Sequence, residues 1–391
     1  MVDQDQTQRA AACPTPPFHL KSYSLMLHID KGILSVFVLL AGCSSRINSS
    51  NPTLPPPVVT IIPATSTPTP TPLPTSTRTM EQALKPFTIE GLSQRHYAGG
   101  RIRIRETLLE SDHFTRYLIE YPSEDLLITG VLQIPRVGAP PYPVIVMNHG
   151  FFSRYVYSSG DGTDRAAEFL NRRGYLTISS DYRSWGGSEE GISLFYSGLA
   201  IDVIHLINAL TSIPQADPDR LGMWGHSMGG GVTLKVLTVD ARVKAAVLYS
   251  TVSGDFADLI ERWGPGCLGD VYIGESTFGC NSSDILPADT PQDLIDAYFA
   301  GSADPAVLRS VSPIYHLDRI RAPVQITYGS EDGETSAGTP PEWSKKLYEA
   351  FTEAGKEARL YGHAGEGHSL LADEWFNFME RSAQFFDRNV R

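Results

Sequence analysis

Residues 225–229, with the sequence Gly-His-Ser-Met-Gly, place a serine between two glycines in a G-x-S-x-G pattern. Residues 221–224 before it are apolar, and residues 230–237 after it can begin a helix. A serine between such elements fits a sharp strand-to-helix turn that exposes a nucleophilic hydroxyl. The glycines meet a steric requirement, because this turn strains the backbone and brings strand and helix close together. We therefore predict that Ser227 is a nucleophile and that the N–H of Met228 faces the oxygen of a reacting carbonyl. The alternative is a glycine-rich turn with a capping serine.

A serine nucleophile of this kind requires an acid and then a histidine later in the chain. Residues 322–329 read as a buried strand that ends in glycine, and Asp332 follows in the next loop. A loop after a strand end can bring a carboxylate to the back of an imidazole. Asp332 is therefore the predicted acid, with Glu331 and Glu334 as the competing carboxylates.

The histidine is predicted in the glycine-rich segment 362–369, which follows a strand-like segment and precedes the last amphipathic helix. We predict that His368 is the general base. His363 lies in the same segment and is the alternative.

A second donor for the oxyanion is expected after an early central strand. Residues 142–148 form an apolar run typical of a buried strand, and His149-Gly150 turns the chain after it. The N–H of Phe151 is the predicted second donor. For His149 we expect a structural, hydrogen-bonding role in the turn.

Residues 86–391 resemble an α/β-hydrolase, and within that superfamily they are most similar to the catalytic domain of the prolyl oligopeptidase family and its dienelactone-hydrolase-like relatives. Residues 121–132 resemble the opening hairpin of that domain, and residues 181–188, Asp-Tyr-Arg-Ser-Trp-Gly-Gly-Ser, are similar to its D-Y-R-G-x-G-x-S stretch, with Ser184 in place of the first glycine. The resemblance implies an α/β fold with a mostly parallel central sheet flanked by helices. It also implies hydrolysis of an ester or peptide through an acyl-enzyme intermediate, with no cofactor.

Alternating strand-like and helical segments in this part of the chain independently favour a mostly parallel sheet. Two features depart from the prolyl oligopeptidases that bear a propeller. Asn148 stands where those enzymes use a tyrosine in the oxyanion hole, and no blade-like repeat precedes the catalytic domain. Both features favour esters or short peptides over prolyl-specific cleavage.

An insertion of about residues 252–310 interrupts the alternation of strands and helices. It contains several aromatic residues, including Trp263 and Tyr298, and no clear strand before about Pro323. In this superfamily such an insertion commonly forms a lid over the serine. The alternative is a surface decoration far from Ser227.

The N-terminal part predicts where the protein works. Residues 32–40 are apolar and have the length of a signal-peptide core, too short to span a bilayer. Leu-Ala-Gly-Cys at residues 40–43 resembles a bacterial lipobox, in which Cys43 is lipidated. Residues 1–43 are thus a predicted signal region, with translation starting at Met26. We expect the mature protein to be exported and lipid-anchored to the bacterial membrane on its extracytoplasmic side.

Residues 44–85 form a predicted disordered linker, because their Pro, Thr and Ser bury too little apolar surface to offset the entropy of ordering. Prolines make such a spacer semi-rigid. The domain that follows, residues 86–391, has a length within the range of a single α/β core.

Export to an oxidising compartment predicts a disulfide between Cys267 and Cys280. Cys43 is taken by lipid and Cys13 lies outside the mature chain, which leaves these two cysteines. The alternative is two buried free thiols. A formal net charge of −12 argues against nucleic acid as a partner, and no Cys/His spacing indicates a metal site.

Together these features predict an exported, membrane-tethered serine hydrolase acting on a small-molecule ester or a peptide. A prolyl oligopeptidase-like serine peptidase is one alternative. A catalytically inactive, surface-binding lipoprotein is an alternative of another class, against which the complete Ser227, Asp332 and His368 set argues.

Overall fold

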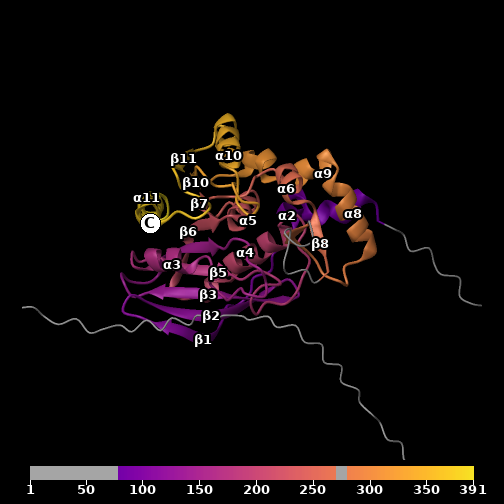
Figure 1. Cartoon of the computed structure of the whole chain (residues 1–391). Helices are drawn as coiled ribbons and strands as arrows, with labels where there is room; N and C mark the ends of the chain where they lie inside the picture. Colours follow the sequence, from indigo (N-terminus) through magenta and orange to yellow (C-terminus); the bar gives the residue numbers. More distant parts are fainter. Residues whose placement is uncertain (1–77, 270–279) are drawn as a thin grey trace, which may run out of the picture. The chain divides into compact units, whose positions relative to one another are not determined.

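The computed structural model describes residues 78–269 and 280–391. Their main feature is a nine-stranded sheet, coloured from indigo to yellow in Figure 1. In chain order its strands are β1 (Arg103–Glu110), β2 (Phe114–Ser123), β3 (Leu126–Pro135), β4 (Tyr142–Asn148), β5 (Leu176–Ser180), β6 (Ala216–His226), β7 (Ala245–Tyr249), β10 (Val324–Gly329) and β11 (Ala358–His363). Their order across the sheet is β1-β2-β3-β5-β4-β6-β7-β10-β11.

The sheet is mostly parallel, as predicted. In sheet order from β5 to β11, each strand runs parallel to its neighbour. The pairs β1–β2, β2–β3 and β3–β5 are antiparallel. The segment that resembles an opening hairpin is β2 and β3, whose register pairs Ser123 with Leu126. Because parallel strands point the same way, the loops that follow β4, β6, β10 and β11 emerge at one edge of the sheet.

Helices cover both faces of the parallel part. Alternate residues of β4 enter two separate hydrophobic cores: Val144 and Val146 belong to one, Ile145 and Met147 to the other. This explains why β4 reads as a continuous apolar run, since a strand buried on both faces has no polar side. The first core is shared with α4 (Ser197–Ala209), α5 (Met228–Leu237) and α10 (Pro341–Glu353), and the second with α3 (Asp164–Asn171) and α11 (Ala372–Asn389).

The ordered domain begins earlier than predicted. The linker was expected to extend through residue 85, but α1 (Met80–Leu84) starts inside it and leads through a 3-10 turn (Lys85–Phe87) to α2 (Ile89–Gln94). Thr79 begins α1 with a reciprocal capping box: its side chain accepts from the N–H of Gln82, and the Gln82 side chain accepts from the N–H of Thr79. The predicted signal region, Met26, Cys43 and most of the linker lie outside the described residues.

The insertion contains more regular structure than its sequence indicates. It holds α6 (Phe256–Trp263), the short parallel pair β8 (Gly266–Leu268) and β9 (Asn281–Leu286), α8 (Gln292–Ser302) and α9 (Pro305–Val311), followed by a 3-10 segment (Pro313–Arg319). The expectation of no clear strand here was wrong, because β8 has only three residues and β9 begins with the polar residues Asn-Ser-Ser-Asp, which do not resemble a buried strand. In Figure 1 these helices gather on one side of the domain beside α2, where α8 contacts α1 and α9 contacts α2. None of the helices in the described ranges is long and apolar enough to cross a membrane.

A buried polar network holds the insertion to the rest of the domain. The hydroxyl of Tyr298 on α8 donates to Asp284 of β9 at 2.7 Å and accepts from the N–H of Gly266 at 2.7 Å. Asp284 also accepts from the N–H of Tyr196 at the start of α4, at 3.2 Å. Burial raises the pKa of Asp284, although these hydrogen bonds oppose the shift. Nearby, Lys235 of α5 is buried and donates to the carbonyl of Val311 at 2.8 Å, and burial lowers its pKa to about 7.

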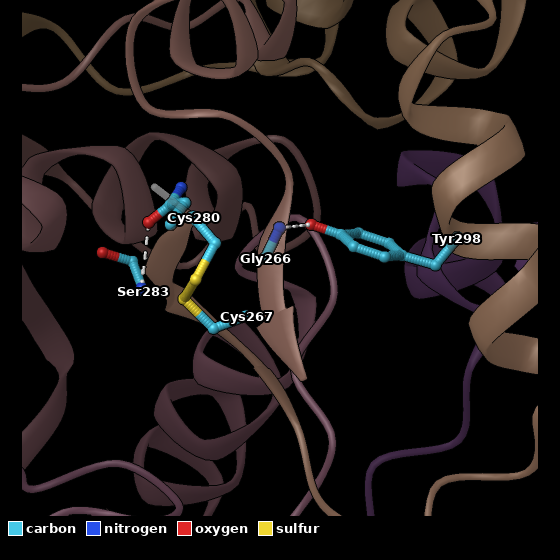
Figure 2. Close-up of a disulfide and its surroundings, with 6 residues drawn as sticks. Gly266, Cys267, Cys280, Ser283 and Tyr298 are labelled. Carbon is cyan, nitrogen blue, oxygen red and sulfur yellow. Dashed lines mark hydrogen bonds between the residues drawn. A yellow bond between two sulfur atoms is a disulfide. The ribbon is translucent and has the colours of Figure 1, made fainter. Parts of the chain in front are cut away.

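A disulfide joins Cys267 on β8 to Cys280, directly before β9, with a Cα–Cα distance of 5.1 Å (Figure 2). Figure 2 also shows the Tyr298 side chain approaching the N–H of Gly266, next to the bridge. The bridge and this hydrogen bond therefore fix the same short strand.

Replacing both cysteines, Cys267→Ser with Cys280→Ser, should lower the free energy of unfolding by about 2–3 kcal/mol, because the bridge spans 13 positions and restricts the unfolded chain. Urea denaturation of the oxidised protein measures the change. A reductant should lower the stability of the natural protein similarly and leave the double variant unaffected. Two titratable thiols in the unreduced natural protein would contradict the bridge.

Candidate active site

Ser227 occupies a strained turn between β6 and α5. Its backbone has φ 55° and ψ −123°, a region that residues with a side chain rarely adopt. Neighbouring strands hold it there: its N–H donates to the carbonyl of Tyr249 at 2.9 Å, and its own carbonyl accepts from the N–H of Gly230 at 2.9 Å. The residue is 9% exposed, so its surroundings are almost closed. This is the geometry that the G-x-S-x-G pattern predicts.

The two flanking glycines are required by close backbone contacts. A Cβ on Gly225 would lie 2.3 Å from the carbonyl oxygen of Gly229, and a Cβ on Gly229 would lie 2.1 Å from the carbonyl oxygen of Asn148. Both distances are far below contact distance, and both partners are backbone atoms that cannot rotate away. The close approach of β4, β6 and α5 therefore depends on these two positions.

Phe151 and Met228, the predicted oxyanion donors, line the same pocket as Ser227. Within residues 78–269 and 280–391, neither backbone N–H donates to a protein acceptor. Met228 is the first residue of α5, where the N–H has no partner inside the helix. Two unpaired donors beside a serine can bind the oxygen of a carbonyl as it becomes negative.

Asn148 does not face this pocket. Its side chain is fully buried and donates to the hydroxyl of Thr233 on α5 at 2.8 Å. Thr233 in turn donates to the carbonyl of Gly229 at 2.8 Å. Asn148 thus anchors β4 to the first turns of α5. Its side chain does not take the place of the oxyanion-hole tyrosine with which the resemblance aligns it.

Asp332 lies in the loop after β10 and is 3% exposed. Each of its carboxylate oxygens lies 3.0 Å from Nδ1 of His368, and Thr339 donates to it through its N–H at 2.8 Å and its hydroxyl at 2.7 Å. Burial alone would raise the pKa of Asp332, but the hydrogen bonds from His368 and Thr339 outweigh burial and lower it. The competing carboxylates Glu331 and Glu334 are both exposed.

His368 therefore pairs with Asp332, whereas His363 does not. His363, the last residue of β11, places Nδ1 2.5 Å from the carboxylate of Glu374 on α11. That contact ties a strand end to a helix and does not involve Asp332. Since Nδ1 of His368 donates to Asp332, Nε2 is the nitrogen left to accept a proton.

No hydrogen bond joins the Ser227 hydroxyl to His368 among the described residues. Hydrogen bonds of this kind are often long before a substrate is bound. The histidine nevertheless lies beside the serine turn, because its ring centroid is 4.8 Å from that of His226, the residue before Ser227.

His226 has a structural part in the site that the sequence reasoning missed. Its Nε2 lies 3.1 Å from the carbonyl oxygen of His368, and because a carbonyl only accepts, Nε2 carries the proton. Its ring also packs against Tyr249 at a centroid distance of 4.5 Å. Burial, and then the neighbouring imidazole of His368, lower the pKa of His226 to about 3, so the ring is neutral at pH 7. The only signal in the sequence is its place in the G-x-S-x-G pattern, which does not reveal its partner.

His149 lies in a buried aromatic cluster, as expected for a structural residue. Its ring stacks on Tyr157 at 4.6 Å and contacts Tyr182 at 4.4 Å, and Nδ1 lies 2.7 Å from the carbonyl of Gly150. Burial lowers its pKa. The cluster fixes the turn that presents Phe151.

The pocket at Ser227 is small, with a volume of about 50 Å³. Trp263 and Ser283 of the insertion form part of its wall, so the insertion reaches the serine as a lid would. The residues that line it are Phe151, Tyr196, Ser227, Met228, Val252, Trp263, Ser283 and Ala337.

Comparison with known proteins agrees with this architecture. A family model described as alpha/beta hydrolase fold matches residues 143–276, from β4 into the insertion. The chain is 26% identical over 261 residues to the uncharacterized peptidase YuxL of Bacillus subtilis (strain 168), covering 64% of this chain and 35% of that protein. It is 32% identical over 127 residues to an uncharacterized 31.7 kDa protein of Escherichia coli, covering 32% of this chain and 42% of that one. The chain thus spans less than half the length of these two relatives.

Among solved structures, acetyl xylan esterase 1 from Thermoanaerobacterium sp. JW/SL YS485 matches with a TM-score of 0.53 and 17% identity, covering 75% of this chain and 90% of that one. With a sequence identity this low, the structural match shows the fold alone. The sheet order, the strained serine turn and the family match agree on one conclusion: the chain has the α/β-hydrolase fold.

Proposed function

We propose that this protein is a serine hydrolase that cleaves an ester or peptide bond through a covalent acyl-enzyme intermediate. One observation carries the proposal: Ser227, held at positive φ, lines a pocket with Phe151 and Met228, whose backbone N–H groups have no protein acceptor among the described residues. Hydrolysis by a serine needs a nucleophile and oxyanion donors placed together in this way. The similarity to a peptidase and the structural likeness to an esterase support the same reaction class.

In the proposed reaction, Ser227 Oγ attacks the carbonyl carbon while Nε2 of His368 takes the hydroxyl proton. The carbonyl oxygen becomes negative and is bound by the two backbone N–H groups. Collapse of this intermediate breaks the bond to the leaving group, which receives the proton from His368. Water then repeats the sequence on the acyl-enzyme and releases the acid. Asp332 keeps His368 in the tautomer that presents Nε2 and stabilises the imidazolium.

Two alternatives remain distinguishable by experiment. A prolyl oligopeptidase-like peptidase should cleave aminoacyl-nitroanilides, whereas an esterase should cleave nitrophenyl esters. An inactive surface-binding protein should cleave neither and should not react with a fluorophosphonate. The absence of a tyrosine at Asn148 and the small pocket favour the esterase.

The proposal extends to location. The lipobox-like residues 40–43 and the Pro/Thr/Ser-rich residues that follow support export, with a lipid on Cys43 and a spacer between the membrane and the domain. The pairing of Cys267 with Cys280 is compatible with an oxidising compartment.

Ser227→Ala should reduce turnover of a nitrophenyl ester or an aminoacyl-nitroanilide more than about a thousandfold, since the hydroxyl forms the covalent bond. Circular dichroism should show an unchanged fold. Retention of more than about a thousandth of the natural rate would contradict Ser227 as the nucleophile.

His368→Ala should be as damaging as Ser227→Ala, because the two residues act as a unit. His363→Ala should cost less than about tenfold in turnover, since His363 contacts Glu374 and not Asp332. The ratio of the two rates on one substrate is the measurement, and the reverse ranking would move the base to His363.

Cys43→Ser should release the protein from the membrane fraction or leave its signal region uncleaved, because the lipid is attached to this sulfur. Fractionation and intact mass measure both effects. Unchanged membrane association together with an unchanged mass would contradict the anchor.

A further inference from the structure

The pocket at Ser227 is much smaller than an ordinary ligand site. Its volume of about 50 Å³ compares with roughly 300–1,000 Å³ for typical small-molecule sites. A carbonyl bound by Phe151 and Met228 therefore leaves space for only a very small substituent on its acyl side.

Trp263 is the largest side chain in this wall and the last residue of α6. Its indole N–H donates to the carbonyl of Ser336 at 2.7 Å, and its ring packs edge-to-face on Trp343 of α10 at 5.4 Å. The indole is thus fixed at both its polar and its apolar side. A fixed aromatic wall cannot move aside at low cost to admit a longer chain.

The remaining wall matches an uncharged group. Phe151, Met228, Val252 and Ala337 contribute apolar surface, and none of the residues that line the pocket is charged. A peptide would bring an amino-acid side chain and a preceding residue on its acyl side, which exceed the available volume. An acetyl group fits it.

We propose that Trp263 is the residue that sets acyl-chain length, and that the enzyme takes esters of acetyl-sized acids. This rests on the proposed function of Ser227. Removal of the indole opens the pocket toward the insertion, and longer acyl chains then enter. Loss of the hydrogen bond to Ser336 affects the rate with every substrate equally. The ratio of kcat/KM between two substrates therefore measures only the effect of the pocket wall.

The test measures kcat/KM for p-nitrophenyl acetate, butyrate and octanoate. The natural enzyme should prefer acetate to octanoate by at least about a hundredfold, and Trp263→Ala should lower this ratio by at least about tenfold, in line with the discrimination that hydrophobic pockets achieve. Trp263→Phe should lower the ratio in the same direction by less. Trp343→Phe is the matched control, because it makes the same change in the same aromatic pair at a residue that does not line the pocket. It weakens one support of the Trp263 ring and leaves the wall in place, so it should lower the ratio by less than Trp263→Phe does.

Three outcomes would overturn the proposal. The acetate-to-octanoate ratio could be unchanged in both Trp263 variants, it could change as much in Trp343→Phe as in Trp263→Phe, or the natural enzyme could prefer octanoate. Rates of Ser227 labelling by fluorophosphonates with short and long alkyl chains give a second readout that needs no turnover. Labelling without the expected chain-length ratio overturns the role of Trp263 alone. No labelling by either probe overturns the proposed function, and the role of Trp263 with it.

Discussion

The strained backbone at Ser227 is the constraint on which the site depends. A residue at φ 55° is stable only where its surroundings hold it, and here β7 binds its N–H while the first turn of α5 binds its carbonyl. Within the described part of the chain, the same turn leaves the N–H of Met228 without an acceptor, and it brings α5 so close to β4 that position 229 tolerates no Cβ. The position of the Ser227 hydroxyl, the free N–H of Met228 and the packing of α5 are therefore consequences of one local conformation.

Asp332 and His368, the proposed acid and base, come from distant loops, and specific contacts bring them to this turn. Thr339 holds Asp332 through two hydrogen bonds, and Asp332 holds His368. His226 then binds the backbone of His368 from the serine side. Since burial and the nearby imidazole keep the pKa of His226 near 3, its ring is neutral at pH 7 and donates to that carbonyl.

Much of this could be predicted from the sequence, where the signals are local. The G-x-S-x-G pattern has apolar flanks, and β4 reads as buried because both of its faces are covered. Some of what was missed depends on partners far away in the chain, since Asn148 finds Thr233 only once β4 and α5 are adjacent. The rest is local but was masked by composition. Thr79 lies at the end of a threonine-rich segment, although Gln82 three residues later completes its capping box, and β9 begins with the polar residues Asn-Ser-Ser-Asp.

The insertion does more than cover the serine, because it supports the loop that carries the acid. Arg262 donates to the carbonyls of Gly333 at 3.1 Å and Thr335 at 2.7 Å, and Trp263 donates to that of Ser336. All three acceptors lie between Asp332 and Thr339, the residue that positions its carboxylate. The end of α6 therefore contributes both to the pocket wall and to the support of the loop that holds Asp332. If Trp263 sets acyl-chain length as proposed, a substitution that removes its indole also removes a hydrogen bond to the loop of Asp332, which couples acyl-chain selectivity to the general rate.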